Sequence, residues 1–141
     1  MKHTITNRII VGKSIGFVVG GLVFFLLPMF GVFLEIKFGL GLWLLYILLG
    51  VLTAFFGIMD HHPILKFKMP FGFRGAVAGL SMHLLLVLLA YNQVAALMTD
   101  FFTAKYGLLS PWWILIDGMI LGILMEWAET KFAGEGNIPL K

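Results

Sequence analysis

Four long apolar runs, separated by short polar stretches, make up most of the chain. A helix needs about 20 predominantly apolar residues to cross the hydrocarbon core of a bilayer. Each run reaches or approaches that length, and we predict membrane-spanning helices at residues 14–33, 38–59, 76–98 and 111–127. The pattern therefore predicts an all-α integral membrane protein, with one four-helix domain over residues 1–141.

The polar stretches carry residues that end or begin helices. Pro63 is expected to end the second helix, because proline has no N–H for the helical hydrogen-bond ladder. Ser110 followed by Pro111 is typical of a helix start, and we expect the serine hydroxyl to cap free backbone N–H groups. Gly134 is placed to end the fourth helix.

Composition strengthens the membrane assignment and removes several classes of chemistry. The chain is 60% hydrophobic and 12% charged, whereas a soluble domain has about 25% charged residues. Its apolar surface must therefore face lipid. The chain has no cysteine, which excludes disulfides, thiolate nucleophiles and cysteine-ligated metals. The motifs of P-loop, Rossmann, GxSxG and HExxH enzymes are also absent.

The ten basic residues predict the direction of the spans. Eight of the ten fall in the N-terminal segment, the middle loop and the C-terminal tail, and Lys37 and Lys105 lie on the opposite side. Basic loops stay on the cytoplasmic side of a membrane. We therefore expect a multi-pass protein of the inner cell membrane with both termini cytoplasmic. The formal charge of +3 needs no nucleic acid to explain it.

Small residues recur at intervals of four or less in every predicted span. Helices in lipid pack closely where small residues let their backbones approach. We therefore predict a tight bundle with small-xxx-small interfaces. The stripes are Gly12, Gly16 and Gly20; Gly50, Ala54 and Gly57; Gly75 and Gly79; and Gly118 and Gly122.

His83 and Glu126 are the first two candidates for a binding or proton-transfer site. Each continues a glycine stripe, and both are expected at a similar depth near the cytoplasmic side. Ionisable groups inside a membrane are expensive and often functional. We predict a His83–Glu126 pair, with two structural alternatives left open: His83 hydrogen-bonded to a backbone carbonyl, and Glu126 reaching the headgroup layer.

Asp117, Asn92 and Gln93 are candidates for a second polar site, near the outer side. Counted along their helices, they reach a similar depth, and a carboxylate with two amides suits a cation or a polar solute. Asp117 and Glu126 are nine residues apart, which places them on opposite sides of one helix. Asp117 is therefore expected to face away from its own bundle, where a second subunit would cover it. The alternative to a second subunit is a bend in the fourth helix that lets Asp117 reach the headgroups past Trp113. The alternative to a binding site is a hydrogen-bonded structural role for Asp117.

The most polar segment, MDHHPILKFKMPFGFR at residues 59–74, carries Asp60, His61 and His62. Alternating aromatic and basic residues after them are typical of a segment that lies in the headgroup layer. The competing interpretation is a metal site. It is weaker, because adjacent histidines on a helix point about 100° apart, whereas helical metal pairs are usually four residues apart.

These patterns predict a protein of the lipid bilayer without catalysis of its own. It would move a small polar solute or ion as a homo-oligomer, or act as a membrane subunit of a larger complex. We expect no cofactor under either interpretation. The alternative is a membrane-embedded redox enzyme subunit, which would bind haem or a metal ion through His83, Glu126 and the cluster of Asp60, His61 and His62.

Overall fold

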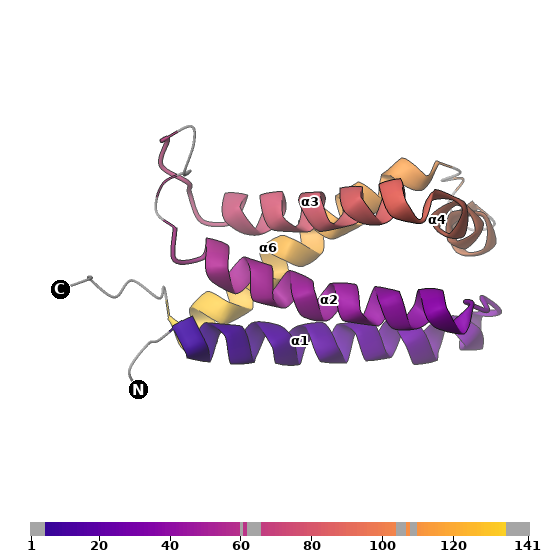
Figure 1. Ribbon diagram of the computed structural model, residues 1–141, viewed down its shortest axis with the longest axis horizontal. Helices are drawn as coiled ribbons and strands as arrows, with labels where there is room; N and C mark the ends of the chain where they lie inside the picture. The colour runs from indigo at the N-terminus through magenta and orange to yellow at the C-terminus, as the bar shows by residue number, and fades with distance from the viewer. Residues whose placement is uncertain (1–4, 60, 62–65, 104–106, 108–109, 135–141) are drawn as a thin grey trace.

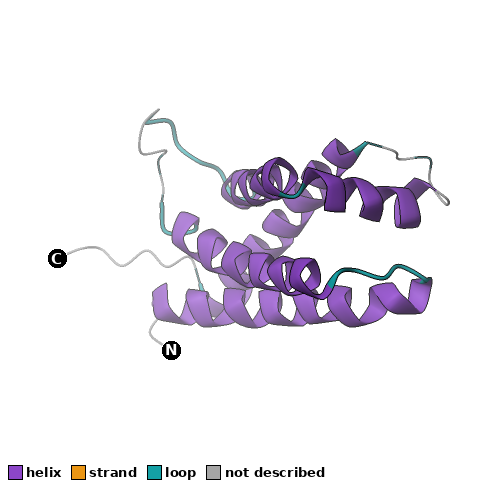
Figure 2. Ribbon diagram, turned by 45° about the vertical axis from the view of Figure 1, so that its right-hand side comes forward, coloured by secondary structure: helices purple, strands orange, loops and turns teal. Residues whose placement is uncertain are grey.

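The computed structural model describes residues 5–59, 61, 66–103, 107 and 110–134. Within these ranges the chain is helical, apart from turns and one isolated β-bridge between His61 and Lys68 (Figure 2). Four long helices and several short ones follow one another. They are α1 (Ile5–Leu26), η1 (Leu27–Phe30), α2 (Ile36–Phe56), α3 (Phe73–Leu89), α4 (Tyr91–Leu97), the π-helical η2 (Met98–Thr103), η3 (Pro111–Trp113) and α6 (Ile114–Ala133).

Three of the described helical segments are long and apolar enough to cross a membrane: Ile5–Phe30, Ile36–Phe56 and Pro111–Ala133. A fourth span is present if Phe73–Leu89 and Tyr91–Asp100, which meet at a bend of 104°, count as one. The prediction of an all-helical chain with apolar helices of membrane-spanning length is therefore confirmed.

The third predicted span, 76–98, is wrong as one straight helix because it breaks at Ala90. The Ala90 backbone is out of helical geometry at φ −133° and ψ 40°. No proline or glycine stands near the break. Instead, Val94 and Leu97 are buried against Val87 of α3 in the same apolar cluster. Packing of α4 onto this cluster stabilises the bend.

The predicted bounds of the first and fourth spans are also too short. The first helix begins at Ile5 rather than at residue 14, and the fourth continues to Ala133 rather than ending at 127. Arg8 and Glu129, which lie in these added turns, are buried in an ion pair with one another, so they do not end the helices. Ser110 makes no side-chain capping hydrogen bond. Gly134 does end α6, with φ 78° and its N–H bonded to the Thr130 carbonyl at 3.0 Å.

Two antiparallel helix pairs, α1 with α2 and α3 with α6, form the body of the molecule (Figure 1). In the first pair a Cβ at Gly12 would overlap the Gly50 carbonyl. In the second pair a Cβ at Gly79 would overlap the Gly118 carbonyl. The glycine stripes therefore lie at the helix contacts, as the sequence predicts.

The start of α1, the end of α2, the start of α3 and the end of α6 all lie at one end of the bundle (Figure 1). Side-chain contacts join them there: Arg8 bonds to the Gly134 carbonyl, and Arg74 bonds to the Gly57 carbonyl. The opposite end carries η1, α4, η2 and η3.

Candidate functional site: a carboxylate in an apolar groove

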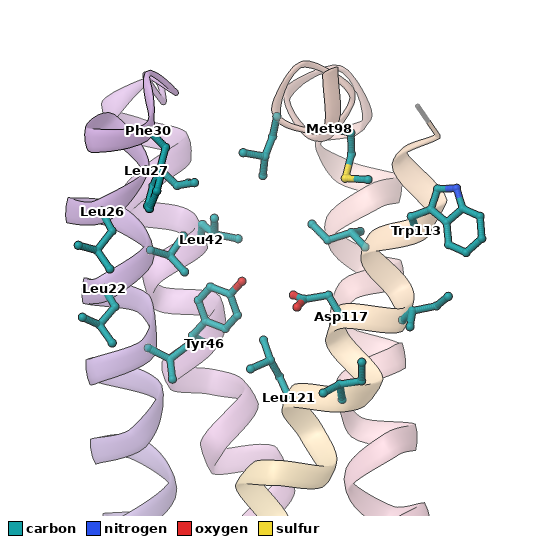
Figure 3. A pocket seen from close by; sticks show the side chains of 16 residues that line it. Leu22, Leu26, Leu27, Phe30, Leu42, Tyr46, Met98, Trp113, Asp117 and Leu121 are labelled. Carbon is teal, nitrogen blue, oxygen red and sulfur yellow. The ribbon is translucent and has the colours of Figure 1, made fainter. Parts of the chain in front are cut away.

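A groove of about 630 Å³ lies between the two helix pairs, toward the end that carries η1 and η3 (Figure 3). One wall comes from α1, η1 and α2, and the other from α6 and η3 together with Leu97 and Met98. Fourteen of the sixteen lining residues are apolar. The other two, described next, are Tyr46 and Asp117.

Tyr46 and Asp117 enter the groove from opposite walls and point toward one another (Figure 3). Tyr46 lies on α2 and is only 4% exposed. Asp117 lies on the first turn of α6, and its side chain is 50% exposed. The groove thus presents one accessible carboxylate among apolar side chains.

His83 lies directly behind Asp117 and is completely buried. Its Nδ1 is 3.0 Å from the Gly79 carbonyl oxygen, one helical turn earlier on α3. Its Nε2 is 3.7 Å from Asp117 Oδ2 and has no hydrogen-bond partner among the described residues. The His83 ring also packs near the Tyr46 ring, with centroids 6.0 Å apart. Tyr46 and Asp117 therefore line the groove, and His83 lies behind them, outside its lining.

The predicted pairing of His83 with Glu126 is wrong. His83 follows Gly79, which contacts Gly118, so it lies opposite the first half of α6 and beside Asp117. Glu126 lies about two and a half turns beyond Asp117 on α6, opposite Gly75. The antiparallel register of α3 and α6 sets which of their residues lie at the same depth. The position of a residue along its own span does not reveal this register.

The predicted orientation of Asp117 is also wrong. Asp117 and Glu126 do lie on different sides of α6, but both sides face the chain itself. This is possible because α6 packs on α3 along one side and borders the groove along another. Asp117 lines the groove of its own chain and is half-exposed there. The second subunit stays an untested prediction.

Glu126 belongs to a different cluster, at the other end of the bundle. Its Oε1 accepts a hydrogen bond from Arg74 Nε at 2.8 Å. Its Oε2 accepts from the backbone N–H groups of Gly72 at 3.0 Å and Gly75 at 2.8 Å. Arg74 also donates to the Gly57 carbonyl at 2.9 Å, which ties α2 to this pair.

A second buried pair, between Arg8 and Glu129, lies next to the first. Arg8 Nη2 is 3.2 Å from Glu129 Oε2, and both side chains are fully buried. The Thr53 hydroxyl donates to Glu129 Oε1 at 2.6 Å. A Cβ at Gly57 would overlap the Arg8 guanidinium, so glycine at 57 makes room for it.

We call Arg8, Thr53, Arg74, Glu126 and Glu129 the ion-pair cluster. All four carboxylate oxygens in it accept hydrogen bonds. One donor, Arg8 Nε, has no partner among the described residues. The cluster joins α1, α2, α3 and α6, and hydrogen-bonded charges of this kind hold helices together.

Arg8, Arg74 and Glu129 were not among the predicted site residues. Arg8 stands four residues before Gly12 on the stripe of α1, and Arg74 directly precedes Gly75. One basic residue on a glycine stripe and one beside another, with two acids on the stripe of α6, are the sequence signal for this cluster.

The remaining candidates do not join the groove. Asn92 and Gln93 are exposed on α4 and do not line it. His61 is exposed, and Asp60 and His62 lie outside the described residues. Within the described ranges, no three His, Cys, Asp or Glu side chains are grouped to hold a metal ion. The haem or metal alternative stays an untested prediction.

The described residues thus place one accessible carboxylate in an apolar groove and four buried charges in a separate cluster. The first arrangement can attract a cation, and the second connects helices. Comparison of the chain with protein-family models, with curated proteins and with solved structures finds no match in any of the three.

Proposed function

We propose that this chain is a multi-pass membrane protein that binds a small, positively charged, partly apolar solute in the groove and carries it across the bilayer. The observation that carries the proposal is the half-exposed Asp117 carboxylate in a groove that is otherwise almost entirely apolar. A carboxylate among apolar groups is costly without a counter-charge. A cation is therefore the complementary ligand.

The size and lining of the groove favour a solute with an apolar part. Ligand pockets typically have volumes of about 300–1,000 Å³, and the groove, at about 630 Å³, falls within that range. Leucine, isoleucine and valine side chains line most of it. They would bury a hydrocarbon chain or ring, while the Tyr46 ring and the Asp117 carboxylate would contact the charged group.

The surface supports a location within lipid. Large apolar side chains such as Phe25, Met29, Phe33 and Leu89 are more than 60% exposed. Exposed apolar surface on this scale suits hydrocarbon rather than water. Phe67, Phe71 and Phe73 are exposed beside Lys66 and Lys68, as in a segment that lies in the headgroup layer.

We place both ends of the described chain on the cytoplasmic side of an inner membrane. The start of α1 and the end of α6 lie at one end of the bundle, together with the basic segment between α2 and α3. Since the chain has no cysteine, Lys68→Cys and Lys37→Cys provide clean labelling sites. A membrane-impermeant thiol reagent added to intact cells should label Lys37→Cys alone, and labelling of Lys68→Cys would reverse the orientation.

Transport requires that the groove open to each side in turn. The two helix pairs meet in the ion-pair cluster at one end and border the groove at the other. Rocking of one pair against the other is a common way to change access in carriers. In this arrangement the cluster would act as the pivot, and the groove would widen or close.

The experiment compares ligands that share a decyl chain and differ in charge. Purified protein in lipid nanodiscs is titrated with decylammonium, decyltrimethylammonium, decanol and decanoate, and uptake of the bound probes into proteoliposomes is then measured. We expect saturable binding of at least one cation to wild type, lost in Asp117→Asn. Asp100→Asn removes an exposed carboxylate outside the groove and serves as the control. Equal binding of all four probes to wild type and Asp117→Asn would refute the proposed function.

A further inference from the structure

The hydrogen bonds of His83, behind the groove carboxylate, indicate which cations the groove can bind. A backbone carbonyl oxygen can only accept a hydrogen bond. Because His83 Nδ1 is 3.0 Å from the Gly79 carbonyl oxygen, Nδ1 must carry the hydrogen. In the neutral ring, Nε2 then has a lone pair and no hydrogen. That lone pair lies 3.7 Å from Asp117 Oδ2.

Two acceptors therefore face one another: Asp117 Oδ2 at the groove, and the buried His83 Nε2 behind it. A lone pair opposite a carboxylate oxygen is unfavourable, and His83 Nε2 is fully buried with no partner among the described residues. Two additions resolve this conflict. A proton on Nε2 lets the imidazolium donate to the carboxylate, or a ligand N–H group donates to Nε2 while its positive charge neutralises Asp117.

We infer that His83 Nε2 and Asp117 Oδ2 together bind either one proton or the N–H-bearing ammonium group of an amphiphilic amine, in exchange for one another. The inference rests on the proposed function and names the chemical class of its solute. A primary ammonium has three N–H donors, enough for both acceptors once the half-exposed Asp117 side chain moves aside and opens a path to the buried Nε2. A quaternary ammonium has the same charge but no N–H, so it leaves Nε2 without a donor.

The exchange is balanced in charge. With the proton bound, His83 carries +1 and Asp117 carries −1. When an alkylammonium R–NH₃⁺ binds, the proton leaves Nε2 to water, His83 becomes neutral, and the ammonium supplies the +1. Both loaded states are neutral, whereas the site without proton or amine carries an uncompensated −1 in apolar surroundings, which is disfavoured. The site thus couples amine binding to proton release.

Other titratable groups do not supply this charge. From α2, Tyr46 is the titratable residue at the groove in the described part of the chain. The lining residues of α1 and η1, with Leu97, Met98 and Trp113, have no titratable group. Further along α3 and α6, Glu126 is bonded to Arg74. His83 and Asp117 are therefore the groups that hold the exchanging proton.

The test measures binding of decylammonium and decyltrimethylammonium to wild-type protein in nanodiscs, each corrected for the signal of Asp117→Asn. We expect decylammonium to bind at least about tenfold more tightly, because the quaternary head group lacks a charge-assisted hydrogen bond. We also expect its affinity to fall about tenfold per pH unit on the acidic side, since one proton competes. A weakly buffered pH dye should register about one proton released per amine bound.

His83→Leu removes Nε2 and should abolish the preference for the primary amine, while Asp117 still binds both cations. The comparison of head groups on wild type needs no variant, so the test survives if His83→Leu does not fold. Equal affinities for the two cations, both dependent on Asp117, would overturn the inference and leave the proposed function standing. A preference kept in folded His83→Leu would overturn it too. If neither cation shows Asp117-dependent binding to wild type, the proposed function itself is refuted.

Discussion

Helix α6 carries three carboxylates that lie in two different environments. Glu126 and Glu129, in its second half, are fully buried, and each accepts hydrogen bonds at both oxygens and pairs with an arginine. Asp117, in its first turn, is half-exposed in the groove, and the nearest ionisable partner is His83 at 3.7 Å. The same chemical group is thus buried and paired in one half of the helix and half-exposed at a groove in the other.

The difference shows what makes buried charge compatible with a stable bundle. A buried ion pair contributes little net stability, but removal of one partner leaves an uncompensated charge. The ion-pair cluster must therefore stay complete for the helices to remain joined. Asp117 has no such partner, so the bundle should not depend on it. Stability and binding are then separable on one helix.

The largest loss of stability is expected for Glu129→Leu, in the ion-pair cluster. It leaves Arg8 buried without its counter-charge, and we expect the free energy of unfolding to fall by about 3–5 kcal/mol. Unfolding by denaturant in detergent, followed by circular dichroism, measures the change. Glu35→Gln alters an exposed carboxylate and should stay within about 0.5 kcal/mol of wild type. A similarly small effect of Glu129→Leu would mean that the pair does not hold the bundle.

The double variant Arg8→Leu with Glu129→Leu tests whether the two residues act as a pair. It removes both charges, so neither is left unpaired. We expect it to be more stable than either single variant, so that its loss of unfolding free energy is well below the sum of the two single losses. The four proteins are compared in one denaturant series. Additive losses would show that Arg8 and Glu129 act independently.

Gly79→Ala tests the close helix contact that sets the position of His83. The new Cβ would overlap the Gly118 carbonyl, so α3 and α6 must separate. We expect a loss of about 1–3 kcal/mol in unfolding free energy. Gly41→Ala is the matched control, because a Cβ at that exposed position on α2 meets nothing within 4 Å. It should be neutral or stabilise by up to about 1 kcal/mol, since alanine favours helix. Equal effects at the two positions would contradict the role of the glycine stripe.

The smallest effect on stability should come from Asp117→Leu. Leucine matches the apolar lining of the groove and removes a carboxylate that costs free energy there. We expect unfolding free energy unchanged or raised by up to about 1 kcal/mol, together with loss of cation binding. A strongly destabilised Asp117→Leu protein would show that Asp117 is part of the structure and not a free binding group.

Much of the helical architecture was predictable from the chain itself. The four apolar runs became helices because each is long and carries few charges. The glycine stripes predicted where helices touch, since a backbone without Cβ lets another backbone approach. Gly134 ends α6 with a positive φ that other residues avoid. These are local properties, and sequence spacing reports them directly.

Three features depended on the tertiary structure. The run from residue 76 to 98 contains no helix breaker, yet packing of Val94 and Leu97 bends it at Ala90. The basic residue that pairs with Glu126 is set by the register of α3 against α6. This register is a long-range property, and residue spacing within one helix does not encode it.

The environment of Asp117 was the third. Residue spacing correctly put Asp117 and Glu126 on different sides of α6, but what each side faces is set by where the other helices lie. The ion-pair cluster joins the two helix pairs at one end, and at the other end a groove remains between them. The sequence by itself determined that the four apolar runs are helical and which helix faces carry glycine or charge. The tertiary structure decided which of those charges are paired and which one is left accessible, because pairing depends on contacts between helices that are distant in the chain.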